Sequence, residues 1–130
     1  MSTTRSGDAI RILIADDTPD IRLLLKMSLS RVEGFEVVGE AVDGQEAIDL
    51  VRSHHPDAVI LDLAMPRVDG LQAISTIRAS SPGTKIIVFS GFEATRMMSK
   101  ALELGAHGYI EKSTSLSDLK DQIRTICRAA

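Results

Sequence analysis

Acidic residues that directly follow two apolar stretches are the first features of this sequence that could do chemistry. Asp62 comes straight after the run AVIL at residues 58–61, and Asp16 and Asp17 come after the run IRILIA at residues 10–15. An unpaired carboxylate in a protein interior costs several kcal/mol, so a fold that keeps one must compensate its charge. A hard divalent ion with oxygen ligands, above all Mg²⁺ that retains some of its waters, suits such a group of acids.

Two further polar side chains stand at the ends of other apolar runs. Ser90 follows KIIVF at residues 85–89 and is itself followed by a glycine, and Lys112 comes shortly after the short run YI at residues 109–110. Taken singly, Ser90 fits an ordinary strand-end hydroxyl and Lys112 a solvated charge. Together with the acids and a metal, they supply a nucleophile, a clamp, a hydrogen-bond donor and a cation, which is the set that phosphoryl transfer needs.

The apolar runs alternate with stretches of helical periodicity. Short, β-branched runs predict strands at residues 10–15, 35–41, 58–61, 85–89 and 109–110. Helices are expected from Thr18 as N-cap to a stop at Gly34, from a capping box at Asp43, at residues 70–79 and 94–104, and from Ser115 onwards. The predicted inner faces are Ile21, Leu24, Leu25, Leu29 and Val32 in the first helix, and Leu116, Leu119, Ile123, Ile126 and Cys127 in the last.

Strands that alternate with helices predict an α/β fold, a flavodoxin-like doubly wound sheet of five parallel strands in the order 2-1-3-4-5. Ligands bind such sheets beyond the carboxyl ends of the strands, where the strand order reverses, here between the first and third strands. Neighbouring strands lie ~4.8 Å apart, so Asp16, Asp17 and Asp62 should converge in one pocket. Their mutual repulsion should raise at least one pKa unless a cation is present.

Composition limits the classes of function. The chain has 130 residues and a net charge of −3, values that suit one hydrophobic core and give no reason to expect binding to nucleic acid or a membrane. Cys127 is the single cysteine, which fits a reducing cytoplasm. No apolar run approaches the ~20 residues that span a bilayer. We expect a polar tail at residues 1–8 and a single domain at residues 9–130.

Three groups of motifs carry a resemblance to a known family. They are the pair Asp16-Asp17, then Asp62 followed by Met65-Pro66 and Asp69-Gly70, and finally Ser90 and Lys112. With these motifs the sequence resembles, over residues 9–128, the receiver domain of bacterial two-component response regulators. The stretches VVGEAVDGQEA, VFSG and GAHGYIEK resemble the subfamily that carries a C-terminal LuxR-type helix-turn-helix.

The resemblance implies a role for each site residue. Asp62 would be the phosphoacceptor, Ser90 the switch hydroxyl, Lys112 the phosphate-binding lysine, and Tyr109 an aromatic that changes rotamer on activation. Mg²⁺, or Mn²⁺ in its place, would be held by Asp17, Asp62 and the backbone carbonyl of Ala64, with Asp16 acting through water. The chain would then catalyse only its own phosphorylation and dephosphorylation.

The same resemblance implies partners and leaves the output open. The phosphoryl donor would be a sensor histidine kinase or a phosphotransfer protein, and the face made by the fourth helix, the fifth strand and the last helix would serve dimerisation or output. The chain is either the receiver of a DNA-binding transcription regulator or a stand-alone receiver. A haloacid-dehalogenase-type phosphatase would need Asp-x-Asp, which Asp62-Leu63-Ala64 lacks.

The remaining residues that could bind a ligand have simpler interpretations. His54, His55 and His107 show no metal-ligand spacing and are expected on the surface or in loops. Met97 and Met98 are expected to take part in the packing of the fourth helix rather than in a binding site.

Overall fold

A central parallel sheet organises the molecule. The computed structural model describes residues 9–31, 34–63, 70–91 and 97–128. The sheet has five strands in the order β2-β1-β3-β4-β5, and every strand pair is parallel. The strands are β1 (Ile10–Ala15), β2 (Phe35–Ala41), β3 (Ala58–Leu61), β4 (Lys85–Ser90) and β5 (Gly108–Glu111). The predicted fold class and strand order are confirmed.

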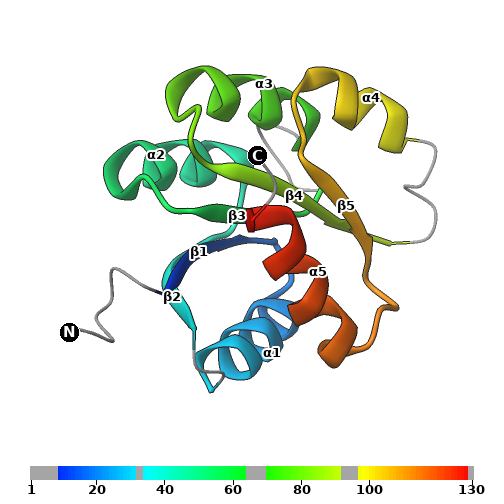
Figure 1. Ribbon diagram of the computed structural model, residues 1–130. Helices are drawn as coiled ribbons and strands as arrows, with labels where there is room; N and C mark the ends of the chain where they lie inside the picture. Colours follow the sequence, from blue (N-terminus) through cyan, green and yellow to red (C-terminus); the bar gives the residue numbers. More distant parts are fainter. Residues whose placement is uncertain (1–8, 32–33, 64–69, 92–96, 129–130) are drawn as a thin grey trace.

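Helices cover both faces of the sheet. They are α1 (Pro19–Ser30), α2 (Gly44–His54), α3 (Gly70–Ser80), α4 (Met98–Leu104) and α5 (Leu116–Arg128). Figure 1 shows α1 and α5 on one face and α2, α3 and α4 on the other. Within the described ranges, no helix is long and apolar enough to cross a membrane.

Each face of the sheet buries its own apolar core, because successive side chains of a strand point to opposite sides. In β1, Ile12 and Ile14 belong to the core under α1 and α5, whereas Leu13 and Ala15 belong to the core under α2, α3 and α4. All four side chains are at most 1% exposed. This double burial explains why the strands are continuous apolar runs rather than alternating ones.

Two of the predicted helix caps are present, and one is replaced. The Asp43 Oδ1 accepts from the Glu46 N–H at 2.8 Å, and the Ser115 Oγ accepts from the Asp118 N–H at 3.2 Å. Thr18 occupies the N-cap position of α1, but its side chain makes no capping bond. Instead its N–H donates to the Asp16 Oδ1 at 2.9 Å, so Asp16 organises the turn into the helix.

Several predicted apolar contacts are wrong. Leu24 is 50% exposed and Leu116 is 37% exposed, because the buried stripes of their helices are narrower than the sequence pattern suggests. Met97 and Met98 are 37% and 39% exposed, so part of each side chain faces solvent. The helix α1 ends at Ser30, before the predicted stop at Gly34.

Some expectations fall on residues outside the described ranges. These are the tail at residues 1–8, Val32 in the first helix, Ala64, and residues 94–96 at the start of the predicted fourth helix.

The start of β5 depends on a histidine that was expected only on the surface or in a loop. The His107 N–H donates to the carbonyl of Ile86 at 2.7 Å, and the Ile86 N–H donates back to the His107 Nδ1 at 3.0 Å. The imidazole therefore takes the place of a backbone carbonyl at the end of the β4–β5 ladder. His107 is a partly buried structural residue.

Candidate functional site

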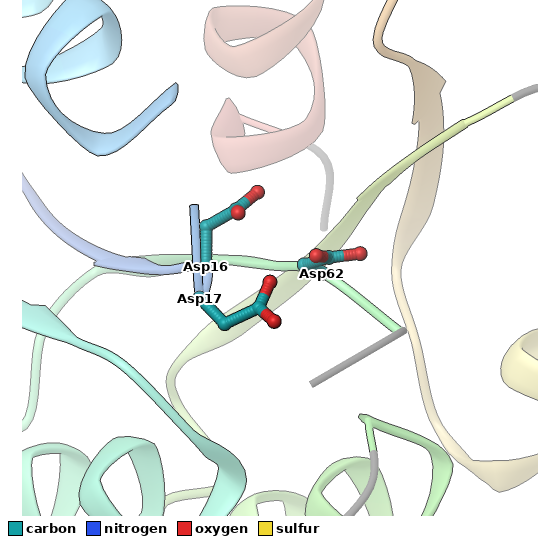
Figure 2. Close-up of side chains that lie close together, drawn as sticks. All are labelled: Asp16, Asp17 and Asp62. Atoms are coloured by element: carbon teal, nitrogen blue, oxygen red, sulfur yellow. The ribbon is translucent and has the colours of Figure 1, made fainter. Parts of the chain in front are cut away.

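Three carboxylates meet at the carboxyl ends of β1 and β3. One oxygen from each of Asp16, Asp17 and Asp62 lies within 4.8 Å of the others. Figure 2 shows Asp16 and Asp17 at the end of β1 and Asp62 just after β3. The pairing of the two strands continues past their ends, since the Asp62 N–H donates to the Ala15 carbonyl at 2.9 Å. The predicted convergence of the acids is confirmed, and it follows from strand register.

Lys112 provides the cation that compensates the two buried acids. Its Nζ lies 3.0 Å from the Asp16 Oδ2 and 3.3 Å from the Asp62 Oδ2. Burial alone lowers the pKa of the Lys112 ammonium, but the hydrogen bond to Asp16 and the charges of Asp62 and Asp16 outweigh burial and raise its pKa overall. Lys112 therefore stays charged at neutral pH and offsets the cost of burying Asp16 and Asp62, which are 1% and 3% exposed.

The neighbouring acids Asp16 and Asp17 are held very differently. Asp16 uses both its backbone and its side chain: its N–H donates to the Ala41 carbonyl at 3.0 Å, and its own carbonyl accepts from the Arg22 Nη1 at 2.8 Å. Asp17 is exposed, and its carboxylate has no hydrogen bond or ion pair within the described ranges. Asp16 is thus part of the framework, while Asp17 has oxygens available for a ligand.

Ser90 and Tyr109 lie on the strands beside β3. Ser90 is 1% exposed at the end of β4, and its carbonyl accepts from the Lys112 N–H at 2.9 Å, which ties the end of β4 to the turn after β5. Tyr109 pairs with Val88 across β4 and β5, and its hydroxyl is buried without a hydrogen-bond partner in the described part of the chain. Burial, and then the charge of Glu111, raise the pKa of Tyr109. Ala64 lies outside the described residues.

Two residues near the site were missed by the sequence analysis. Arg22 reaches from α1 to the Asp16 carbonyl, and its Nε lies 3.4 Å from the Glu40 Oε1 on β2. Arg22 stands one turn into a helix that begins directly after the acidic pair. The short distance in sequence from Asp17 to Arg22 is the signal that could have predicted a contact between the Arg22 side chain and the end of β1.

The donor set suits a hard cation. Carboxylate oxygens from separate strand ends, one of them exposed, match the ligands that Mg²⁺ takes while keeping some of its waters. Asp62 belongs to this group and also lies beside the Lys112 ammonium, so it is a carboxylate whose charge can be shielded when an anionic reactant approaches.

Comparison with known families decides what kind of domain this is. The family described as the response regulator receiver domain matches residues 12–124. The chain belongs to this receiver-domain family. Members of the family are generally phosphoacceptor switches that bind Mg²⁺ at an acidic pocket, and the cluster of Asp16, Asp17 and Asp62 fits such a pocket.

Individual receivers and regulators support the assignment. The transcriptional regulatory protein PdtaR of Mycobacterium tuberculosis is 47% identical over 119 residues, which cover 90% of this chain and 57% of that protein. The receiver domain of the response regulator NarL from M. tuberculosis has a TM-score of 0.89 at 28% identity, covering 95% of this chain and 99% of that one. A LuxR-family response regulator from Aurantimonas has a TM-score of 0.85 at 34% identity, covering 92% and 85%. The predicted resemblance is confirmed, and this receiver spans little more than half the length of the M. tuberculosis regulator PdtaR.

Proposed function

We propose that this receiver accepts a phosphoryl group on Asp62 and relays a two-component signal. The observation that carries the proposal is the position of Asp62, buried after β3, clustered with Asp17 and 3.3 Å from the Lys112 ammonium. A buried carboxylate beside a cluster of metal-ligating oxygens and a lysine can act as a nucleophile toward an anionic phosphoryl donor.

The proposed reaction is a transfer from a phosphohistidine on a sensor histidine kinase or a phosphotransfer protein. An oxygen of Asp62 attacks the phosphorus; the new P–O bond forms as the P–N bond breaks, and the imidazole leaves and is protonated. Lys112 shifts part of its pairing from the acids to the phosphoryl oxygens, and the hydroxyl of Ser90 donates to them. Mg²⁺ or Mn²⁺, held by Asp17, Asp62 and the Ala64 carbonyl, with Asp16 acting through water, would neutralise charge on the transferring group.

The output we propose is control of transcription by a larger protein. The relatives are named transcriptional regulators, and the match spans 57% of PdtaR, so residues 9–130 would act as the receiver of a regulator with a further domain. A stand-alone cytoplasmic receiver that works by protein contacts is the second candidate.

Labelling by a small phosphodonor tests the phosphoacceptor. Incubation with acetyl phosphate and Mg²⁺ should add one phosphate to the wild type and none to Asp62→Asn, because the amide is not a nucleophile of this kind. Intact-mass spectrometry measures the addition. Asp49→Asn, which removes an exposed acid on α2, is the matched control and should label like the wild type. Labelling of Asp62→Asn would move the phosphoacceptor to another residue.

Metal titration tests the ligand role of Asp17. Asp17→Ala should weaken Mg²⁺ binding at least tenfold, of the order seen when a metal site loses a supporting group (roughly 10–100-fold). Asp20→Ala removes an exposed acid three positions further on and should leave the titration unchanged. A wild-type affinity in Asp17→Ala would remove this residue from the ligand set.

A further inference from the structure

The guanidinium of Arg22 joins three segments around the acidic pocket. Its Nη1 donates to the Asp16 carbonyl at 2.8 Å, and its Nε lies 3.4 Å from the Glu40 Oε1. Arg22 belongs to α1, Glu40 to β2, and Asp16 to the turn after β1. The side chain of Arg22 is only 17% exposed, so this is a largely buried bridge rather than a solvated surface pair.

The hydrogen bond to Asp16 acts on Asp17 through the backbone. The Asp16 carbonyl belongs to the peptide unit whose nitrogen is that of Asp17, and the peptide unit is planar. Holding the carbonyl oxygen therefore holds the plane that contains the Asp17 Cα. The Asp17 carboxylate has no polar partner of its own in the described ranges, so its placement depends on its backbone.

We propose that Arg22 is a positioning residue for the metal site, acting on the cation through Asp17 without touching it. The proposal rests on the proposed function, since it assigns a role in the Mg²⁺ binding inferred above. Glu40 aligns the planar guanidinium so that a second N–H points at the Asp16 carbonyl. Lysine, a point charge on a flexible stem, cannot make both contacts in this fixed geometry.

Lys26 supplies a matched comparison. Its Nζ lies 3.2 Å from the other oxygen of Glu40, so it pairs with the same carboxylate and carries the same charge as Arg22. Its side chain is 53% exposed, and it makes no contact with Asp16 in the described structure. Arg22→Gln and Lys26→Gln each remove one positive charge beside Glu40. Only Arg22→Gln also removes the hydrogen bond that holds the peptide between Asp16 and Asp17.

The sign of the effect separates positioning from simple electrostatics. Removal of a positive charge near an acidic pocket favours cation binding by Coulomb's law, so a purely electrostatic role predicts tighter Mg²⁺ binding in Arg22→Gln. Loss of positioning predicts weaker binding. A role confined to stability predicts a lower melting temperature with unchanged Mg²⁺ affinity of the folded protein.

The experiment is a Mg²⁺ titration of the whole chain by calorimetry, at a temperature where circular dichroism shows each variant to be folded. We expect Arg22→Gln to bind Mg²⁺ about tenfold more weakly than the wild type, as for other groups that orient metal ligands. Lys26→Gln should stay within about twofold, because an exposed charge is screened by salt. In metal-free protein, the Asp17 amide resonance should move in Arg22→Gln and stay in place in Lys26→Gln.

A double-mutant cycle tests whether the effect passes through Asp17. In an Asp17→Asn background, Arg22→Gln should weaken Mg²⁺ binding by much less than it does in the wild type. Equal weakening in both backgrounds, or equal or tighter binding in Arg22→Gln alone, overturns the proposal. If Arg22→Gln does not fold, Arg22→Lys is titrated in its place. A wild-type Mg²⁺ affinity in Arg22→Lys overturns the proposal. A wild type that binds no Mg²⁺ would refute the proposed function itself, and this inference with it.

Discussion

At the level of residues, Asp16 and Asp17 show how two identical neighbours acquire different tasks. The N–H, the carbonyl and both carboxylate oxygens of Asp16 are engaged by Ala41, Arg22, Thr18 and Lys112. Asp17 is exposed beside it. The strand end turns the Asp16 carboxylate into the interior and leaves that of Asp17 facing solvent, so Asp16 supports the site while the oxygens of Asp17 stay available to a cation.

The lysine that neutralises the buried acids should matter most when metal is absent. Lys112→Met leaves Asp16 and Asp62 without their cation, and breaking a buried pair destabilises by about 3–5 kcal/mol, a figure that partial exposure of Lys112 reduces. We expect a lower melting temperature in Mg²⁺-free buffer and a larger recovery on adding Mg²⁺ than in the wild type. Thermal denaturation with and without Mg²⁺ measures this. Lys120→Met on α5 is the control, and an equal response to Mg²⁺ in all three proteins would contradict the expectation.

His107 should make the stability of the fold depend on pH through one hydrogen bond. The Nδ1 of His107 accepts from the Ile86 N–H, so it carries no proton in the folded protein. Burial, then the charges of Lys85 and Arg78, lower the pKa of His107. The folded state therefore favours the neutral imidazole of His107. The stabilisation that this neutral ring provides is fully present above the ordinary histidine pKa of about 6.5. It is lost as the pH falls through the lower pKa that His107 has in the folded protein.

An asparagine at this position should keep the bond and lose the titration. The amide oxygen of His107→Asn can accept from the Ile86 N–H but does not protonate. We expect the melting temperature of His107→Asn to fall less than that of the wild type between neutral pH and pH of about 5. His54→Asn removes an exposed imidazole on α2 and should behave like the wild type. Parallel pH curves for wild type and His107→Asn would rule out the proposed titration.

At the level of elements, α5 packs closely on β5 at Gly108, where the tip of the Ile126 side chain occupies the space that a Cβ would take. A Cβ added at Gly108 would overlap the Cδ1 of Ile126 and lie 3.1 Å from its Cγ1. The close approach brings α5 against the strand that carries Tyr109 and precedes Lys112. The position of the last helix and that of the site lysine are therefore linked through one strand.

This contact predicts a destabilised variant and its rescue. Gly108→Ala should lower the free energy of unfolding by about 1 kcal/mol, the low end of the usual cost of overpacking, because the tip of the Ile126 side chain can turn away from the new methyl group. Adding Ile126→Val deletes the Cδ1 and should recover part of the loss, so the double variant should be more stable than the sum of the single changes predicts. Urea unfolding measures all four proteins. Additive effects would show that the two residues do not interfere.

At the level of the whole molecule, the sheet connects Asp62, the proposed phosphoacceptor, to the region of α4, β5 and α5. Ser90 ends β4. Tyr109 on β5 pairs with Val88 on β4, and its buried hydroxyl has no hydrogen-bond partner in the described ranges. Met98 and Leu102 on α4, and Leu116 on α5, have exposed apolar side chains. A phosphoryl group that draws Ser90 toward it would favour inward rotation of Tyr109 and reshape the face made by α4, β5 and α5, where we expect dimerisation or partner binding.

Beryllofluoride, which mimics an aspartyl phosphate, tests this connection. Amide NMR with Mg²⁺ and beryllofluoride should show shifts that spread from Asp62 through Ser90 to Tyr109 and into α4 and α5. Tyr109→Ala should confine the shifts to the pocket, because the side chain that transmits the change is missing. The helix α2 on the far edge serves as the internal control. Shifts restricted to the pocket in the wild type would exclude the switch.

The order of the strands, the bounds of most elements and the meeting of Asp16, Asp17 and Asp62 could be predicted from the chain alone. Each depends on local periodicity or on parallel strands ending at one edge, and both are written in short stretches of sequence. The pairing of Lys112 with Asp16, the bridge from Arg22 to Glu40 and the bond from Ile86 to His107 could not. These contacts join residues from different elements, and they form only when strand register and helix placement bring particular side-chain atoms within about 3 Å.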